Sequence, residues 1–449
     1  QEPFVLVVYF LYKNTGDNQM KLFNGMTVEN NELAISGVTV SELRRKYGTP
    51  LYVYDENMLE NQCDTFISNF KSEKFKTEVL YASKAFSCLE VLRMANRAGL
   101  GVDVVSLGEI HTAYKAGYDM SKAYFHGNNK TREELKYAIE VGLGTIVIDN
   151  DYEYEMINDL AKESKKTVDV LLRINTGIDA HTHEYIKTAK DDSKFGYSVY
   201  DETIFDLIAD INGQSNLNFL GFHSHIGSQI FEKSSFYEAA KVVMEFSRRV
   251  EEELRLTIKV LNLGGGFGVY YTDEDKPFEL GEFLQEYIKV IETESENFGL
   301  ELEKVVIEPG RSLTCNAGST LYTVGGVKKT FAGREYIFVD GGMADNPRYA
   351  LYKAKYEAAL ANKINADENT VYTVAGKCCE SGDMLVMDTK LPKAEQGDLL
   401  IVPSTGAYNY SMSSNYNRLP KLPVVFVKDG TSRLVIKGET LEDLIRQDI

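Results

Sequence analysis

Short apolar runs rich in β-branched residues alternate with amphipathic stretches between residues 79 and 311, and this alternation constrains the fold more than any other feature. It predicts parallel strands joined by crossover helices. Four of the intervening stretches carry apolar residues at three-to-four spacing, and three of these end in glycine, as helices often do. Eight runs are predicted to be strands: VLYASK from 79, LGVDVVS from 100, AYFHGN from 123, TIVIDN from 145, DVLLRIN from 169, FLGFHSHIG from 219, VLNLGGGFG from 260 and KVVIEPGR from 304. The pattern therefore predicts an α/β fold with a (β/α)8 barrel over residues 55–311.

A different pattern follows the barrel. Residues 312–449 contain β-rich runs such as EYIFVDGG and DLLIVPS with few long helical segments, which predicts a mainly antiparallel β-domain. Residues 20–54 are expected to pack with that domain. Residues 1–19 read unlike the rest and are interpreted as an extension of unclear origin.

Charge and cysteine content narrow the function. The chain has 49 basic and 67 acidic residues, a net charge of −18, which argues against nucleic acid or an anionic membrane as the main partner. The longest apolar run, residues 4–12, is too short to span a bilayer, so no membrane anchor is expected. Five cysteines without a CxxC motif indicate a reducing cytoplasm, and no metal site is predicted.

Polar residues gather where the predicted strands end. Barrel enzymes assemble their sites at this C-terminal mouth. Loops are polar in most proteins, which is enough to explain any one of these polar residues. The opposite ends of the same strands carry no comparable cluster of His, Arg and Glu, so the group as a whole indicates a site. The residues are Lys84, Asp103, Ser106, His126, Asn128, Asp149, Arg173, Asn175, His223, His225, Glu308 and Arg311.

The GGGFG stretch at 264–268 suggests an anion site. It is not a dinucleotide fingerprint, because Val269 stands where a third glycine is needed. Bare glycines such as Gly264, Gly265 and Gly266 let backbone amides approach a phosphate, and EPGR nearby adds Gly310 and the cation Arg311.

A cofactor that carries a phosphate and also needs a lysine is pyridoxal phosphate (PLP), whose aldehyde condenses with an amine. Lys84 is the candidate amine, although a strand-end lysine often simply reaches water. The Glu308 carboxylate is placed to keep the pyridine nitrogen protonated, His225 to lie against the ring and Ser228 to touch the phosphate. A single strand histidine is more often structural.

Several stretches in a fixed order carry a family resemblance from about residue 20 to the C-terminus. The sequence resembles the diaminopimelate decarboxylases, fold type III PLP enzymes related to ornithine decarboxylase and alanine racemase. The matching stretches are YASKAF, GVDVVSLGE, RINTGIDAHTHEYIKTAKDDSKFG, FHSHIGSQ, LNLGGGFG, EPGR, CCESGD and GAYNYSMSSNYN.

The resemblance implies roles for individual residues. Catalysis would rest on Lys84 as the Schiff-base lysine, with His225, Glu308 and Cys379. The cofactor would be bound by Lys84, Asp103, His225, Ser228, Gly264, Gly265, Gly266, Glu308, Gly310, Arg311 and Tyr408. Substrate meso-diaminopimelate would be bound by Arg311, Arg348, Tyr352, Glu380 and Tyr408.

The resemblance also implies a homodimer with a shared active site, in which Cys379 and Glu380 come from the other subunit. Cys379 would return a proton to Cα after carbon dioxide leaves, while Cys378 is interpreted as packing. The DGGMADNPRYALY stretch departs from the family pattern at Ala344 and Pro347, which leaves the local loop geometry open. The adjacent Cys378 and Cys379 form a pair that could oxidise.

Other functions remain open at this stage. Ornithine or arginine decarboxylation, or racemisation, would use the same scaffold without needing Arg348. A non-catalytic homologue acting as a binding partner is a second alternative, disfavoured by the presence of both Lys84 and Cys379. A flavin or nicotinamide barrel oxidoreductase is a third, and it gives Lys84 no role.

Overall fold

Eight parallel strands close into a barrel, as the alternation predicts. The structure, a computed structural model, describes residues 20–178 and 193–449, so the extension at 1–19 and positions 179–192 of the RINTGIDAHTHEYIKTAKDDSKFG stretch lie outside the described residues. Each strand pairs in parallel with its neighbours, and the first and last strands pair with each other. The barrel strands, in order, are β5 (Lys76–Ala82), β6 (Gly101–Val104), β7 (Ala123–Phe125), β8 (Thr145–Ile148), β9 (Val168–Asn175), β11 (Leu217–His223), β12 (Val260–Asn262) and β13 (Lys304–Ile307).

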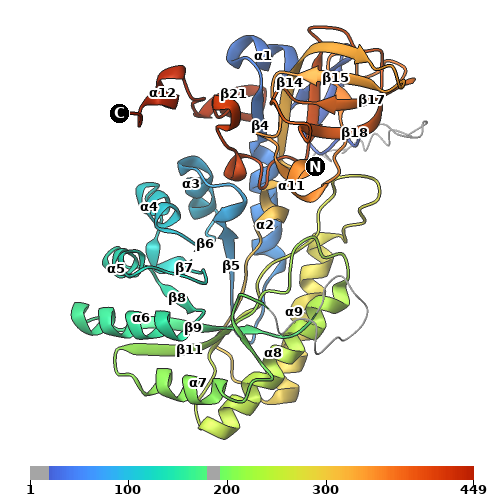
Figure 1. Ribbon diagram of the computed structural model, residues 1–449. Helices are drawn as coiled ribbons and strands as arrows, with labels where there is room; N and C mark the ends of the chain where they lie inside the picture. Colours follow the sequence, from blue (N-terminus) through green and yellow to red (C-terminus); the bar gives the residue numbers. More distant parts are fainter. Residues whose placement is uncertain (1–19, 179–192) are drawn as a thin grey trace, which may run out of the picture.

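Helices cover the outside of the barrel (Figure 1). Three of the predicted helices are followed by Gly99, Gly117 and Gly142, each with a positive φ that favours glycine at a helix C-terminus. The fourth ends instead at Lys165, which adopts the left-handed conformation itself. The helices are α2 (Glu56–Asn69), α3 (Leu89–Arg97), α4 (Leu107–Lys115), α5 (Arg132–Glu140), α6 (Asp151–Ser164), α7 (Ile204–Gly213), α8 (Lys233–Leu254) and α9 (Leu280–Phe298).

The hydrophobic core of the barrel has two layers. The larger cluster joins the outward faces of the strands to the surrounding helices. A smaller cluster draws its members from the barrel strands alone, as expected for side chains that fill a barrel interior. Its members are Leu80, Tyr124, Val147, Leu171, Val260 and Val306. This packed interior leaves the C-terminal mouth as the place for a site.

The second domain is a mainly antiparallel β-sheet, as predicted. Its two parallel pairings join β15 to β17 and β20 to β4. The strand β4 (Leu51–Asp55) enters this sheet from the N-terminal side of the chain and lies between β14 and β20. The other strands of the sheet are β14 (Gly318–Lys329), β15 (Glu335–Val339), β16 (Ala359–Leu360), β17 (Thr370–Ala375), β18 (Met384–Leu391), β19 (Leu399–Pro403), β20 (Val424–Lys428) and β21 (Thr431–Ile436).

Short elements complete the chain. A three-stranded sheet precedes β4, and β10 extends the edge of β9. Among residues 20–178 and 193–449, no helix combines the length and apolar character needed to cross a bilayer. These elements are β1 (Met26–Glu29), β2 (Glu32–Ile35), β3 (Val38–Thr39), α1 (Val40–Tyr47), β10 (Tyr197–Ser198), α10 (Arg311–Thr314), α11 (Arg348–Tyr352) and α12 (Leu441–Ile445).

The β-domain meets the barrel at its C-terminal mouth (Figure 1). The backbone amide of Tyr408 donates to the carbonyl oxygen of Ala85 at 2.8 Å, and the Ser411 hydroxyl donates to the same oxygen at 3.2 Å. Ala85 also packs in the core cluster of the β-domain. The residue next to Lys84 is thus held by both domains.

Candidate active site

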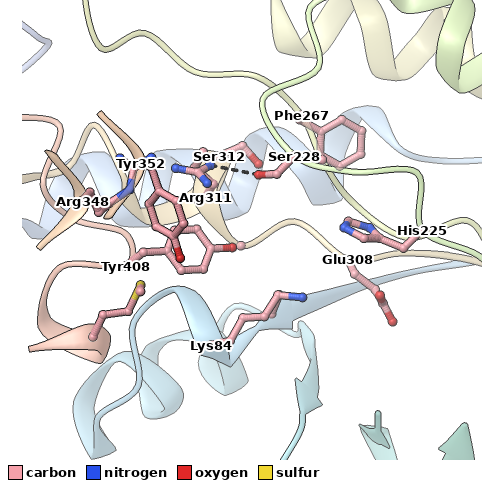
Figure 2. Close-up of a pocket in the computed structure, with 14 residues that line it drawn as sticks. Lys84, His225, Ser228, Phe267, Glu308, Arg311, Ser312, Arg348, Tyr352 and Tyr408 are labelled. Carbon is pink, nitrogen blue, oxygen red and sulfur yellow. Dashed lines mark hydrogen bonds between the residues drawn. The ribbon is translucent and has the colours of Figure 1, made fainter. Parts of the chain in front are cut away.

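A cavity of about 330 Å³ opens at the C-terminal ends of the barrel strands. Ten predicted site residues line it: Lys84, His225, Ser228, Gly266, Glu308, Gly310, Arg311, Arg348, Tyr352 and Tyr408. Five predicted residues do not: Asp103, Gly264, Gly265, Cys379 and Glu380. Figure 2 shows the Lys84 amine pointing to the side where Glu308 and His225 lie, with Arg311 and Arg348 farther along the cavity.

Lys84 is presented by a turn rather than by the strand itself. Strand β5 ends at Ala82, and residues Ser83–Ala85 form a single 3-10 turn that exposes the Lys84 side chain to the cavity. Burial lowers the pKa of this amine, but the interactions with Asp103, Tyr408 and Glu308 outweigh burial and raise the pKa. The electrostatic surroundings therefore favour the ammonium form of Lys84.

Glu308 sits at the centre of a buried polar group. Its Oε1 atom accepts from Asn262 Nδ2 at 2.6 Å and lies 2.7 Å from His126 Nε2, while Oε2 lies 3.1 Å from His223 Nε2. Burial raises the pKa of Glu308, but the interactions with His126 and His223 outweigh it and hold the pKa well below its usual range. Glu308 is consequently a carboxylate.

His225 is a neutral imidazole at the edge of the cavity. Burial and the nearby charges of Lys84 and Arg173 lower its pKa well below the usual value. Its Nδ1 atom accepts from the Gly265 amide at 3.3 Å, which places the ring proton on Nε2. A neutral, fixed ring of this kind can lie against an aromatic ligand.

The glycine loop is shaped by its protein neighbours. A Cβ atom at Gly264 would meet Ser224 O at 2.5 Å, one at Gly265 would meet Glu308 O at 2.2 Å, and one at Gly266 would meet Gly227 O at 2.6 Å. The Gly264 amide donates to Asn262 Oδ1 at 3.0 Å and the Gly265 amide donates to His225. Of the three, Gly266 faces the cavity.

The rest of this end suits a phosphate. A Cβ atom at Gly310 would meet Ala82 Cβ at 2.9 Å, so no larger residue fits there. The Ser228 hydroxyl accepts from Arg311 Nε at 3.2 Å. The Ser312 hydroxyl is buried against the cavity without a hydrogen-bond partner among the described residues, which leaves it for a ligand. These groups fit the anionic tail of PLP.

Two arginines line the cavity on the side away from Glu308 (Figure 2). Arg311 Nη1 donates to the Tyr271 hydroxyl, and Arg348 Nη1 donates to the Tyr356 hydroxyl at 2.8 Å. No carboxylate of residues 20–178 and 193–449 forms an ion pair with Arg311 or Arg348, although Arg348 is buried. Two guanidinium groups that lack an acidic partner among the described residues can form a receptor for a ligand carboxylate.

The departing DGGMADNPRYALY stretch still delivers its functional residues. Pro347 is the N-cap of α11, and Arg348 and Tyr352 on this helix both line the cavity. Ala344 is buried, and its carbonyl oxygen accepts from the Ser414 amide at 2.9 Å. The loop geometry therefore keeps both side chains at the mouth.

Cys379 and Glu380 lie in the turn between β17 and β18, away from the residues that line the cavity. Both are exposed; the Cys379 amide donates to Asn417 Oδ1 at 2.7 Å. Cys378 is buried, and its amide donates to Asp383 Oδ2 at 2.7 Å. Within one chain, the predicted proton donor is not among the residues that line the cavity with Lys84.

The sequence analysis assigns no role to several other residues of the site. His126 and His223 are predicted at strand ends without a function, and Asn262 also lies at a strand end. Tyr271 and Tyr356 follow no motif, so only their contacts in the fold identify them. Phe267, Ser312 and Met412 also line the cavity.

Comparisons with known proteins agree with this geometry. Residues 56–315 match the family model described as "Pyridoxal-dependent decarboxylase, pyridoxal binding domain". The chain is 46% identical over 421 residues to a diaminopimelate decarboxylase of Bacillus subtilis (strain 168), covering 94% of this chain and 96% of that protein. It is 42% identical over 421 residues to one of Staphylococcus aureus (strain COL), covering 94% and 98%.

A solved structure extends the agreement to three dimensions. The diaminopimelate decarboxylase from M. jannaschii in complex with L-lysine superposes with a TM-score of 0.89 at 33% identity, covering 95% of this chain and 98% of that chain. The chain belongs to the family of fold type III pyridoxal-dependent decarboxylases that includes the diaminopimelate decarboxylases.

Proposed function

We propose that this chain converts meso-2,6-diaminopimelate to L-lysine and carbon dioxide with PLP as its cofactor. The observation that carries the proposal is the pair Arg311 and Arg348, which face the same cavity as Lys84 and lack an acidic partner among the described residues. Ornithine and arginine have no second carboxylate to engage these cations, whereas diaminopimelate has one.

The residues that would hold PLP are placed along the cavity. Lys84 would bind its aldehyde, Glu308 would face its pyridine nitrogen, and Ser228, Gly310 and Ser312 would surround its phosphate. When bound, PLP acts as an electron sink that accepts the electron pair left at Cα when carbon dioxide departs.

The chain's own groups then orient the substrate. Arg311 and Arg348 would hold the distal carboxylate, which positions the reacting carboxylate at the Lys84 end. The neutral His225 ring would lie flat against the cofactor without adding charge, and Tyr408, tied to Ala85, would close the mouth. Tyr352 is 63% exposed and would be covered only when substrate or a second subunit arrives.

We further propose a homodimer with a shared active site. Cys379 and Glu380 are exposed in their own chain and are not part of its cavity lining, which suits residues that complete a partner's site. Cys379 would supply the proton that Cα takes up, and Glu380 would meet the distal ammonium. The five cysteines are all free, which supports a reducing, cytoplasmic setting.

The test is a product assay with purified protein and PLP. We expect lysine and carbon dioxide in equal amounts from meso-diaminopimelate, and little product from L-ornithine or L-arginine. The Arg348→Met variant should lose diaminopimelate turnover by about 100-fold or more, since a buried cation that pairs with a carboxylate contributes about 3 kcal/mol or more. Faster turnover of ornithine than of diaminopimelate by the wild type would contradict the proposal.

A further inference from the structure

Two histidines, His126 and His223, lie against the Glu308 carboxylate. His126 follows β7 and His223 ends β11, so the two residues come from different sides of the barrel. Their ring centroids are 4.6 Å apart with planes at 65°, an edge-to-face contact. His223 Nε2 forms a hydrogen bond with Glu308 Oε2 at 3.1 Å, whereas His126 Nε2 lies 2.7 Å from Oε1 but has no aligned hydrogen bond to any described residue. The hydrogen bonds from His223 and Asn262 hold one carboxylate oxygen each, and His126 packs against the same carboxylate.

The burial of His223 and the surroundings of its two ring nitrogens indicate which nitrogen carries the proton. Burial lowers the pKa of His223 to about 3, so the ring is neutral near pH 7 and carries one proton. Its Nδ1 atom is buried without a hydrogen-bond partner among the described residues, whereas Nε2 faces Glu308 Oε2. Because a carboxylate only accepts, the proton belongs on Nε2.

The same cluster reaches the catalytic lysine. His126 Nε2 also lies 3.8 Å from Asp103 Oδ1, and Asp103 is the largest influence that raises the pKa of Lys84. Asn262 completes the group, since it donates to Glu308 and accepts from the Gly264 amide of the glycine loop. Other titratable side chains that interact electrostatically with the cluster include Arg173, His225, Tyr124 and Glu109.

We propose that His126 and His223 are positioning residues that keep Glu308 an ionised carboxylate, so that the pyridine nitrogen of bound PLP stays protonated. A carboxylate that accepts from Asn262 and His223 and lies 2.7 Å from His126 Nε2 is a weaker base than a lone buried one. The proton shared with the pyridine therefore resides on the ring nitrogen, which makes the ring the stronger electron sink. The inference rests on PLP binding in the proposed function but not on which amino acid is decarboxylated.

The first measurement uses the wild-type holoenzyme with ¹⁵N-labelled histidine. The chain has six histidines, which keeps the spectrum simple. We expect the signals of both His126 and His223 to show a proton on Nε2. An unprotonated Nε2 on either ring would overturn the proposal, because that ring could not donate to Glu308.

The second measurement uses PLP labelled with ¹⁵N at the pyridine nitrogen. Its chemical shift separates a protonated from a neutral ring without any turnover. We expect the protonated position in the wild type and in His126→Gln and His223→Gln, which retain a donor. We expect a move toward the neutral position in His126→Leu and His223→Leu. His111→Leu, an exposed histidine that contacts Tyr137, is the matched control and should leave the shift unchanged.

The outcomes separate this inference from the proposed function. The leucine variants should lose kcat by about 10- to 100-fold with KM unchanged, in the range for residues that support a reactive group. An unchanged pyridine shift in folded leucine variants would overturn the inference, as would a stoichiometric metal ion bound by the same three side chains. If a leucine variant does not fold, the histidine spectrum decides. Failure of the proposed function would give a different result: the wild type would form no lysine from diaminopimelate, while the ¹⁵N shifts of the pyridine nitrogen would still follow the expected pattern.

Discussion

At the scale of single residues, the carboxylate receptor formed by Arg311 and Arg348 depends on tyrosines that belong to no recognisable sequence motif. Tyr271 is buried, accepts from Arg311 through its hydroxyl and has Arg348 Cζ 4.7 Å from its ring centroid. One aromatic side chain thus holds two guanidinium groups that would otherwise repel each other. Its role is to fix the spacing of the two cations.

We predict that Tyr271→Phe weakens substrate binding. The variant keeps the ring but loses the hydroxyl that orients Arg311, and a hydrogen bond to a charged group is worth about 1.5–3 kcal/mol. KM for diaminopimelate should rise about 10-fold or more with a smaller change in kcat, measured by steady-state kinetics. Tyr270→Phe is the matched control, because that hydroxyl bonds Glu357 instead. Equal effects of the two substitutions would contradict the assigned role.

Sequence reasoning located the residues whose place in the chain has a topological meaning. Lys84 and Glu308 follow barrel strands. Because the C-terminal ends of the strands form the mouth of the barrel, the sequence alone predicts that these two residues lie at the same site. Tyr271 and Tyr356 lie in irregular segments, and their meeting with Arg311 and Arg348 depends on how two domains pack. Such contacts have no local signal.

At the scale of elements, loops at the barrel mouth are pinned by buried charge. Lys130 Nζ donates to Gly127 O at 2.7 Å, Val147 O at 2.6 Å and Glu153 Oε2 at 2.9 Å. Glu153 also accepts from the backbone amides of Lys130 and Asp149. The pair therefore ties the segment after β7 to the strand β8 and the helix α6.

We predict that Lys130→Met destabilises the protein by about 3–5 kcal/mol, because it leaves Glu153 buried and unpaired. Urea unfolding followed by circular dichroism measures the change. Lys136→Met, on the exposed face of α5 with Glu140 at 3.9 Å, should cost less than about 0.5 kcal/mol. A loss below 1 kcal/mol for Lys130→Met would show that the buried pair does not pin these elements.

The segment between β15 and α11 contains a buried acid. Asp345 accepts from the Gly342 amide at 2.7 Å and from the Tyr322 hydroxyl at 2.6 Å. Burial, the largest influence, raises its pKa to about 7. The unfolded value is near 3.9. Since the folded pKa is the higher one, the stabilisation is complete below about pH 4 and is lost as the pH rises through about 7.

We predict that the wild type loses about 2–3 kcal/mol of unfolding free energy relative to Asp345→Asn between pH 5 and pH 8. Urea unfolding of both proteins at several pH values gives the difference directly, so other titrating groups cancel. Asp367→Asn, at an exposed aspartate, should track the wild type. A pH-independent difference between wild type and Asp345→Asn would contradict the shifted pKa.

Helices and strands that show a periodic pattern or a terminal glycine in their own sequence could be predicted. Strands whose position depends on pairing with residues far away in the sequence could not. The helices α3, α4 and α5 were predicted from their periodicity and from Gly99, Gly117 and Gly142. The strand β4 reads as an ordinary apolar run, yet it lies in the sheet beside β14 and β20, which come more than 260 residues later. The two-residue strand β16 is too short to show any period.

At the scale of the whole molecule, one chain supplies an incomplete set of groups. The cavity brings Lys84, Glu308 and both arginines together, but Cys379 lies outside it. The β-domain is attached to the barrel mouth beside Lys84 through Tyr408 and Ser411. A second copy of the chain is the natural source of the missing proton donor.

We predict that two inactive variants restore activity when mixed. Lys84→Ala and Cys379→Ala, exchanged through mild dissociation, should form heterodimers with one intact site each. Since half of the dimers are mixed and half of their sites are intact, activity should reach about a quarter of the wild-type value. Lys84→Ala mixed with Arg311→Met is the control, because both changes lie in the same chain's cavity and leave no intact site. No recovery in the first mixture would contradict the shared site.

The central claim is that the Lys84 amine binds PLP at the barrel mouth. The most direct measurement is borohydride reduction of the PLP-loaded protein followed by peptide mapping with mass spectrometry. The account predicts one phosphopyridoxyl group per chain, attached to Lys84. A stoichiometric label on another lysine, with Lys84 unmodified, would contradict it.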